Sequence, residues 1–183
     1  MNHRAEDMII SMNIAKQVAL FLLNSDRIQK AIEICNECLI LLNNTNQNSK
    51  DQLNSVLLQF YRDIYTVLFS AYRHISDYIS AERYGRKLFY LYSEYGIMLF
   101  KLGEHLKAKD YFERALTITT EIGDRSVEAS CNGYFGALLP SLGECDKAKG
   151  YLQKALVITT EIGDRKGKAS CYGNLGRVFK SPG

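Results

Sequence analysis

Two cysteines spaced as Cys35-x-x-Cys38 form the most suggestive chemical motif in the sequence. This spacing occurs in thiol redox sites and as half of a zinc site. A zinc site needs a second pair of ligands, and none follows here, while a redox motif ordinarily follows a strand. These cysteines instead lie in a helical apolar pattern. We therefore interpret both thiols as buried packing groups of a helix, because free cysteine packs as a small hydrophobic residue.

The other candidates for catalysis are three histidines, His3, His74 and His105, and the acidic residues near 121–124 and 161–164. No histidine belongs to a His-x-x-x-His pair, and none recurs with the repeat period. The acidic residues do recur, and this favours turn and capping roles over an acid–base pair. The sequence has no Gly-x-x-x-x-Gly-Lys phosphate loop and no local Ser-His-Asp arrangement. We therefore expect a protein that is not an enzyme, with no cofactor and no metal.

The composition is that of a globular protein, with 183 residues, 46% of them hydrophobic and 23% charged. The net charge is +3 and is spread over both halves, without the basic bias that nucleic-acid binding needs. Met8 to Leu23 is apolar but is interrupted by Asn13, Lys16 and Gln17. We interpret this stretch as an amphipathic first helix and expect no signal peptide and no membrane span. The odd number of cysteines then favours a reducing compartment, so we expect a cytoplasmic protein.

An internal repeat dominates the C-terminal half. Residues 101–140 align with residues 141–180 without a gap, and 22 of the 40 positions are identical. Each unit is predicted to form two helices, because Phe112, Ala115 and Ile122 share one helical face. Gly123 can then end that helix in a left-handed conformation, and Asp124 can cap the next helix, which we expect to run to Leu142.

This pattern resembles the tetratricopeptide repeat (TPR), in which small residues let paired helices approach closely. Gly136 takes the position of the consensus glycine in the first helix of the repeat. Ala148 and Ala155 take the small positions of the second helix, with Leu152 at the aromatic position between them. The resemblance implies an all-α fold, a TPR-like α-solenoid of stacked antiparallel helix pairs with about eight helices in a right-handed superhelix.

The 40-residue unit and its Gly-Asp-Arg turn narrow the resemblance. They are similar to arrays in Pins-type G-protein signalling modulators and, more closely, to the long animal proteins called tetratricopeptide repeat protein 28. Members of the latter group often carry a C-terminal CHAT protease-like domain, for which 183 residues leave no room.

The units divide the chain unevenly. Residues 89–128 and 129–168 are regular units, residues 169–183 are a partial unit, and residues 1–88 are interpreted as diverged helix pairs. The polar stretch from Asn43 to Lys50 predicts a loop. A diverged unit begins near residue 62, only 27 residues before the unit at 89, with no turn signal between them. We therefore predict one helix from Tyr78 to Leu102 that is shared by two units.

The resemblance also implies a concave groove lined by the first helix of each unit. The lining positions hold Tyr90, Ser93, Glu94, Ile97, Ser130, Gly133, Tyr134, Ala137, Ser170, Gly173, Asn174 and Arg177. The candidate peptide-binding residues among them are Tyr90, Glu94, Ile97, Tyr134, Ala137, Asn174 and Arg177. Only Asn174 and Arg177 fit the clamp that TPR co-chaperones use for a C-terminal carboxylate, so the groove suits another kind of peptide.

The leading functional prediction is a non-catalytic scaffold or adaptor, acting in signalling, that binds a peptide segment of a partner protein. The alternatives are a peptide-sensing regulatory module, a fragment of a larger CHAT-bearing protein, and a chain with no independent function. The last predicted helix, near residues 169–180, exposes a packing face, so self-association, partner binding or fraying is expected there.

Overall fold

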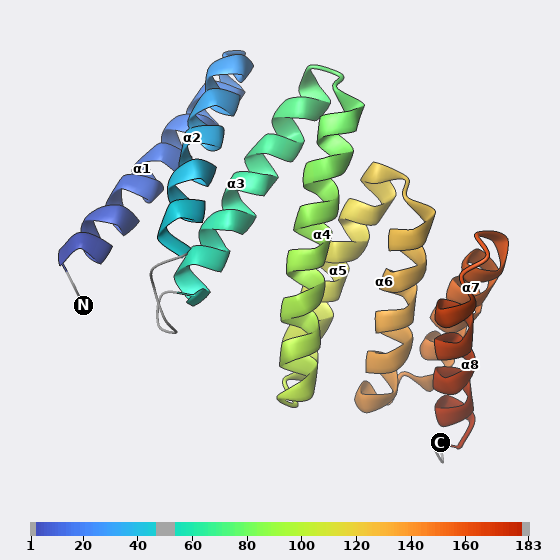
Figure 1. Cartoon of the computed structure of the whole chain (residues 1–183). Helices are drawn as coiled ribbons and strands as arrows, with labels where there is room; N and C mark the ends of the chain where they lie inside the picture. Colours follow the sequence, from blue (N-terminus) through green and yellow to red (C-terminus); the bar gives the residue numbers. More distant parts are fainter. Residues whose placement is uncertain (1–2, 47–53, 181–183) are drawn as a thin grey trace. The chain divides into compact units, whose positions relative to one another are not determined.

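The computed structural model describes residues 3–46 and 54–180, and every regular element within those ranges is a helix. Successive helices within each compact unit run in opposite directions (Figure 1). The elements are α1 (His3–Asn24), α2 (Ile28–Asn46), α3 (Asn54–His74), α4 (Tyr78–Lys101), α5 (His105–Ile122), α6 (Arg125–Leu138), the 3-10 helix η1 (Leu139–Leu142), α7 (Cys145–Glu161) and α8 (Arg165–Lys180).

Contacts divide the chain into two compact units, and Met1–Lys87 is the first. In this unit α1 packs against α2, α2 packs against α3, and α1 also contacts α3. Leu42 and Leu68 are fully buried between these helices. The Lys16 ammonium of α1 donates a hydrogen bond to the Asp63 carboxylate of α3 over 2.6 Å, which ties the first helix to the third.

The second unit, Leu88–Gly183, contains the repeat. In it α5 packs against α6, α6 against α7, and α7 against α8. The repeat is visible in the burial pattern, because α5 and α7 bury side chains at equivalent positions 40 residues apart. The buried sets are Ala108, Phe112, Ala115, Ile118 and Thr119 in α5, and Ala148, Leu152, Ala155, Ile158 and Thr159 in α7.

The turns of the second unit follow the predicted chemistry. Gly123 adopts a left-handed conformation with φ of 67°, as expected of a helix stop. The Asp124 carboxylate accepts hydrogen bonds from the backbone N–H groups of Ser126 and Val127, at 2.9 and 3.3 Å. Both expectations are confirmed, and together they fix where α5 ends and α6 begins.

The predicted shared helix is also confirmed. The structure has a single helix, α4, over Tyr78–Lys101, with no turn between residues 86 and 96. Its residues up to Lys87 belong to the first compact unit and those from Leu88 to the second. One helix therefore supplies the end of one predicted unit and the start of the next.

Two predicted boundaries are wrong. The helix expected to run to Leu142 ends at Leu138 and continues as the 3-10 helix η1. Pro140 explains the change, because proline has no N–H to donate to the carbonyl four residues before it. The predicted loop from Asn43 to Lys50 is helical as far as Asn46, where α2 ends, and residues 47–50 lie outside the described residues.

The first helix exists, but the prediction that it is amphipathic is wrong. Met12, Ala19 and Leu22 of α1 are buried, as expected of a core-facing side. The opposite side is also apolar and is exposed, at Ile10, Ile14, Val18 and Phe21. No helix among the described residues is long and apolar enough to cross a membrane.

Candidate functional site

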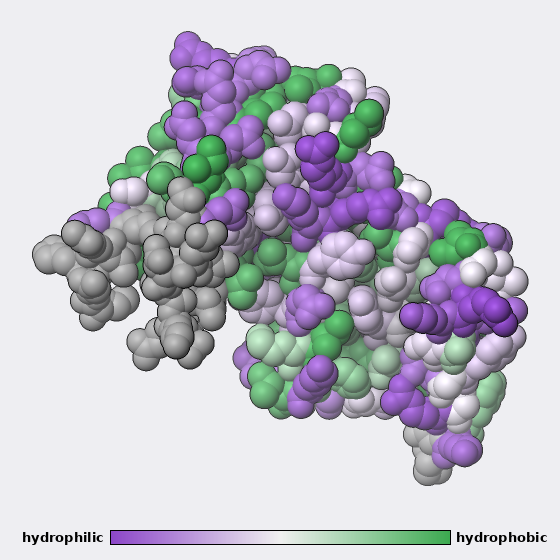
Figure 2. Space-filling view, in the orientation of Figure 1, coloured by the Kyte–Doolittle hydropathy of each residue, from purple (hydrophilic) through white to green (hydrophobic). Residues whose placement is uncertain are grey.

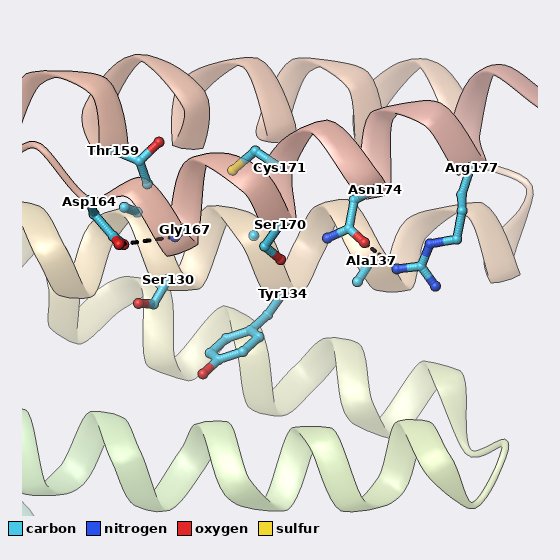
Figure 3. A pocket seen from close by; sticks show the side chains of 12 residues that line it. Ser130, Tyr134, Ala137, Thr159, Asp164, Gly167, Ser170, Cys171, Asn174 and Arg177 are labelled. Atoms are coloured by element: carbon cyan, nitrogen blue, oxygen red, sulfur yellow. Dashed lines mark hydrogen bonds between the residues drawn. The ribbon is translucent and has the colours of Figure 1, made fainter.

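A hollow of about 350 Å³ opens between α6, α8 and the turn that precedes α8 in the second unit (Figure 3). It is lined by Ala129, Ser130, Gly133, Tyr134, Ala137, Thr159, Asp164, Gly167, Ser170, Cys171, Asn174 and Arg177. Small residues leave the space open, and hydroxyl, amide and guanidinium groups stand around it.

The structure brings four of the seven candidate residues together in this hollow. Tyr134 and Ala137 come from α6, and Asn174 and Arg177 come from α8 (Figure 3). The other three, Tyr90, Glu94 and Ile97, lie on α4 and do not line it.

Tyr134 is held firmly on the α6 side. Its ring stacks on Phe112 of α5, with centroids 5.3 Å apart and an interplanar angle of 15°. Burial raises the pKa of its phenol, and the nearby Glu94 carboxylate and Tyr90 phenol raise it further. Tyr134 therefore stays neutral at physiological pH and can offer a hydrogen bond beside an apolar ring.

The two ends of the hollow differ in charge. At one end Arg177 donates a hydrogen bond to the side-chain carbonyl of Asn174, so the two side chains form one polar group (Figure 3). At the other end the Asp164 carboxylate accepts hydrogen bonds from the backbone N–H groups of Lys166, at 3.1 Å, and Gly167, at 3.0 Å. Asp164 thus caps α8 and leaves Arg177 as the cation for an approaching ligand.

Several lining residues are missed by reasoning from repeat positions alone. Thr159 belongs to the end of α7, and Asp164 and Gly167 belong to the turn and first residues of α8. The consensus lining positions cover only the first helix of each unit. The recurring Gly-Asp-Arg turn is the signal that could have identified Asp164, because its capping aspartate sits where α8 begins.

The chemistry of the hollow does not resemble a catalytic site. Cys171 lines it, but burial raises the pKa of this thiol, and a thiol is a nucleophile only as the thiolate. Among the described side chains, no group of three His, Cys, Asp or Glu residues could hold a metal ion.

The Cys35-x-x-Cys38 motif lies in α2, and the prediction that its thiols are buried is confirmed. Cys35 is 2% exposed and Cys38 is 7% exposed, and neither forms a disulfide. Burial, followed by the neighbouring Cys38, raises the pKa of Cys35 to about 12. Neither thiol has the lowered pKa of a redox cysteine.

The paired helices with a 40-residue burial period and glycines at the closest approaches point to a repeat family. Residues 87–156 match the tetratricopeptide repeat family model. The match includes all of α5 and α6 and the adjoining parts of α4 and α7. TPR repeats generally mediate protein–protein interaction and are typically non-catalytic scaffolds. A search of curated proteins gives no significant match.

Solved TPR-like structures share the fold. BtubC (BKLC) from P. vanneervenii matches 98% of this chain and 84% of its own, with 17% sequence identity and a TM-score of 0.50. A kinesin light chain-like protein from Podosopora anserina, with nearly identical TPR-like repeats, matches 98% of this chain and 88% of its own, with 11% identity and a TM-score of 0.40. The fold is all-α, a TPR-like α-solenoid of stacked antiparallel helix pairs, as the sequence predicted.

Proposed function

We propose that the second unit is a non-catalytic interaction module that holds a peptide segment of a partner protein in the hollow between α6 and α8. The observation that carries the proposal is the gathering of Tyr134, Asn174 and Arg177 around one open space floored by small residues. TPR repeats generally bind other proteins, which supports a protein ligand over a small molecule.

The lining indicates the kind of peptide. Arg177 offers a cation that suits an acidic side chain, and Asn174 lies beside it as a hydrogen-bonding partner. Ser130 and Ser170 add hydroxyl groups for backbone contacts. Tyr134 supplies a fixed aromatic surface for an apolar side chain. We therefore propose an extended or helical peptide with an apolar residue near Tyr134 and an acidic residue near Arg177.

The setting of this activity follows from the same residues. A scaffold or adaptor needs no reactive group, and we place the protein in the cytoplasm because its five cysteines are free thiols. A role in signalling rests on the resemblance of its 40-residue units to the arrays of Pins-type modulators, and on nothing else.

A peptide library displayed on phage tests the proposal. Peptides selected on the intact chain are measured by fluorescence anisotropy against wild type and a Tyr134→Ala/Asn174→Ala/Arg177→Ala variant. The variant should weaken binding at least about tenfold, since each side chain contributes to the surface. The matched control, Glu113→Ala/Thr117→Ala/Gln153→Ala, alters exposed residues of α5 and α7 outside the hollow and should bind as wild type. Equal binding by all three proteins would rule out this site.

A further inference from the structure

A second surface lies on α8, away from the hollow. Helix α6 buries one side, formed by Ala129, Asn132, Gly136 and Leu139 together with the start of η1. The equivalent positions 40 residues later are Ala169, Tyr172, Gly176 and Phe179, and all four are exposed in α8. Tyr172 is 55% exposed and Phe179 is 68% exposed. We call these four residues the open face of α8.

The repeat shows what kind of element covers such a face. On α6, a Cβ atom at Gly136 would overlap the Leu152 side chain of α7. On α4, a Cβ atom at Gly96 would overlap the Phe112 ring of α5 in the same way. At Gly176 a Cβ atom would meet nothing within 4 Å. The same glycine therefore receives a large side chain from a packed helix twice and stands open the third time.

Charged residues repeat with the faces. The Lys109 ammonium of α5 donates to the Glu144 carboxylate at the start of α7, over 2.8 Å. Arg125 at the start of α6 donates to Glu161 at the end of α7. A helix on α6 is thus anchored through an acidic residue near each of its ends.

The counterparts of these two cations lie beside the open face. Lys149, equivalent to Lys109, pairs within its own helix with Asp146 at 3.0 Å and lies 5.4 Å from the centre of the Phe179 ring. Arg165, equivalent to Arg125, forms no ion pair within the part of the chain that the structure describes. Beside Lys149 a hollow of about 460 Å³ is bordered by Val178 and Phe179.

We propose that the open face of α8 binds, in trans, an amphipathic helix of a partner protein that has the pattern of α5 and α7. Both helices carry Ala-x-x-Tyr-(Phe/Leu)-x-x-Ala, with a glutamate four residues before the first alanine and another six residues after the second. The large central residue would lie on Gly176, and the two glutamates would reach Lys149 and Arg165. The charge and the shape of the face both select this kind of helix.

On the face shown in Figure 2, hydrophilic and hydrophobic side chains are interspersed over the second unit. The open face thus carries neighbouring cations, which distinguishes a charged amphipathic helix from a purely apolar one as its occupant.

A peptide with the sequence of residues 144–162, carrying Cys145→Ser and a fluorescent label, is the probe. Fluorescence anisotropy with the intact chain should show saturable binding. A Gly176→Leu chain should bind at least about tenfold more weakly, because its side chain fills the position of the incoming leucine. This chain should still fold, since space is open at Gly176 and leucine favours helix; circular dichroism checks that it does. Gly150→Leu, also at a helical glycine with open space, is the matched control and should bind as wild type.

A charge exchange tests the orientation of the bound helix. Arg165→Glu should weaken binding, and a peptide with Glu161→Lys should restore it on that variant. The Tyr134→Ala/Asn174→Ala/Arg177→Ala chain should keep full affinity, which separates this surface from the proposed peptide groove.

Three results would overturn the proposal. The first is no binding by wild type at about 100 μM, a range in which weak helix–groove contacts are still measurable. The second is equal binding by the Gly176→Leu chain. The third is a mass in solution that corresponds to a dimer and falls to that of a monomer on Gly176→Leu, because a second copy would then be the occupant.

Discussion

Gly96, Gly136 and Gly176 occupy one position of the repeat but have different surroundings. At Gly136 there is no room for a Cβ atom, because Leu152 lies against the backbone and is itself fully buried. At Gly176 there is space. Gly136→Ala should therefore lower the free energy of unfolding by about 1–3 kcal/mol through overpacking.

Gly176→Ala should instead raise the free energy of unfolding by up to about 1 kcal/mol, the difference in helix propensity between the two residues. Urea denaturation followed by circular dichroism measures both changes. Opposite signs are expected for the same substitution at equivalent positions. A loss of stability at Gly176 as large as that at Gly136 would show that the open face is already covered.

The cysteines differ in accessibility, and this predicts their reactivity. Burial raises the pKa of Cys35 and of Cys131 to about 12, so neither forms a thiolate at neutral pH. Cys145, at the start of α7, is the one described cysteine that is partly exposed. Iodoacetamide on the native protein should label Cys145 well before the others, as followed by mass spectrometry of tryptic peptides. Fast labelling at Cys35 would contradict the burial of the motif.

At the scale of elements, a capping aspartate begins α6. Asp124 satisfies two backbone N–H groups that the helix itself leaves without partners. Asp124→Ala should cost about 1 kcal/mol of stability, whereas Asp124→Asn, which keeps an acceptor, should cost less. Thermal melts of the three proteins provide the comparison, and equal midpoints would show that the cap contributes nothing measurable.

An ion pair joins α5 to the start of α7 and has a distinct pH dependence. Hydrogen bonds from Lys109 and then Lys147 lower the pKa of Glu144 to about 2, from its ordinary 4.5. Because the folded pKa lies below the unfolded one, this carboxylate stabilises the fold above about pH 4.5, and the contribution is lost as the pH falls toward 2.

Glu144→Gln lacks this contribution at every pH. Its melting temperature should therefore be lower than that of wild type at pH 7, and the gap should close as the pH approaches 2. Melts by circular dichroism across this range measure the gap. A gap of constant size would mean that the carboxylate charge is not the cause.

The sequence predicts the elements better than their ends or faces. Helical spacing around Phe112 and the absence of a turn before Leu102 predicted α5 and the single helix α4, because both signals are local. Pro140 changed the end of α6 although the neighbouring residues continue a helical pattern. The exposed apolar side of α1 is set by which helices surround it, and periodicity does not contain that information.

For the molecule as a whole, the repeat made half of the hollow predictable. Tyr134 and Asn174 follow from counting positions in successive units, because gap-free repeats place equivalent residues on equivalent surfaces. Asp164 and Thr159 come from a turn and from the end of a neighbouring helix, so counting along the first helices does not reach them. The pairing of Arg177 with Asn174 depends on side-chain conformation and becomes visible only in three dimensions.

The central claim is that a peptide occupies the hollow between α6 and α8. Amide chemical shifts of the ¹⁵N-labelled chain, recorded while a library-selected peptide is added, test this claim most directly. The account predicts that the largest changes occur around Tyr134 in α6 and around Asn174 and Arg177 in α8, with small changes on the outer side of α7. Shifts confined to α7, or to the first unit, would contradict it.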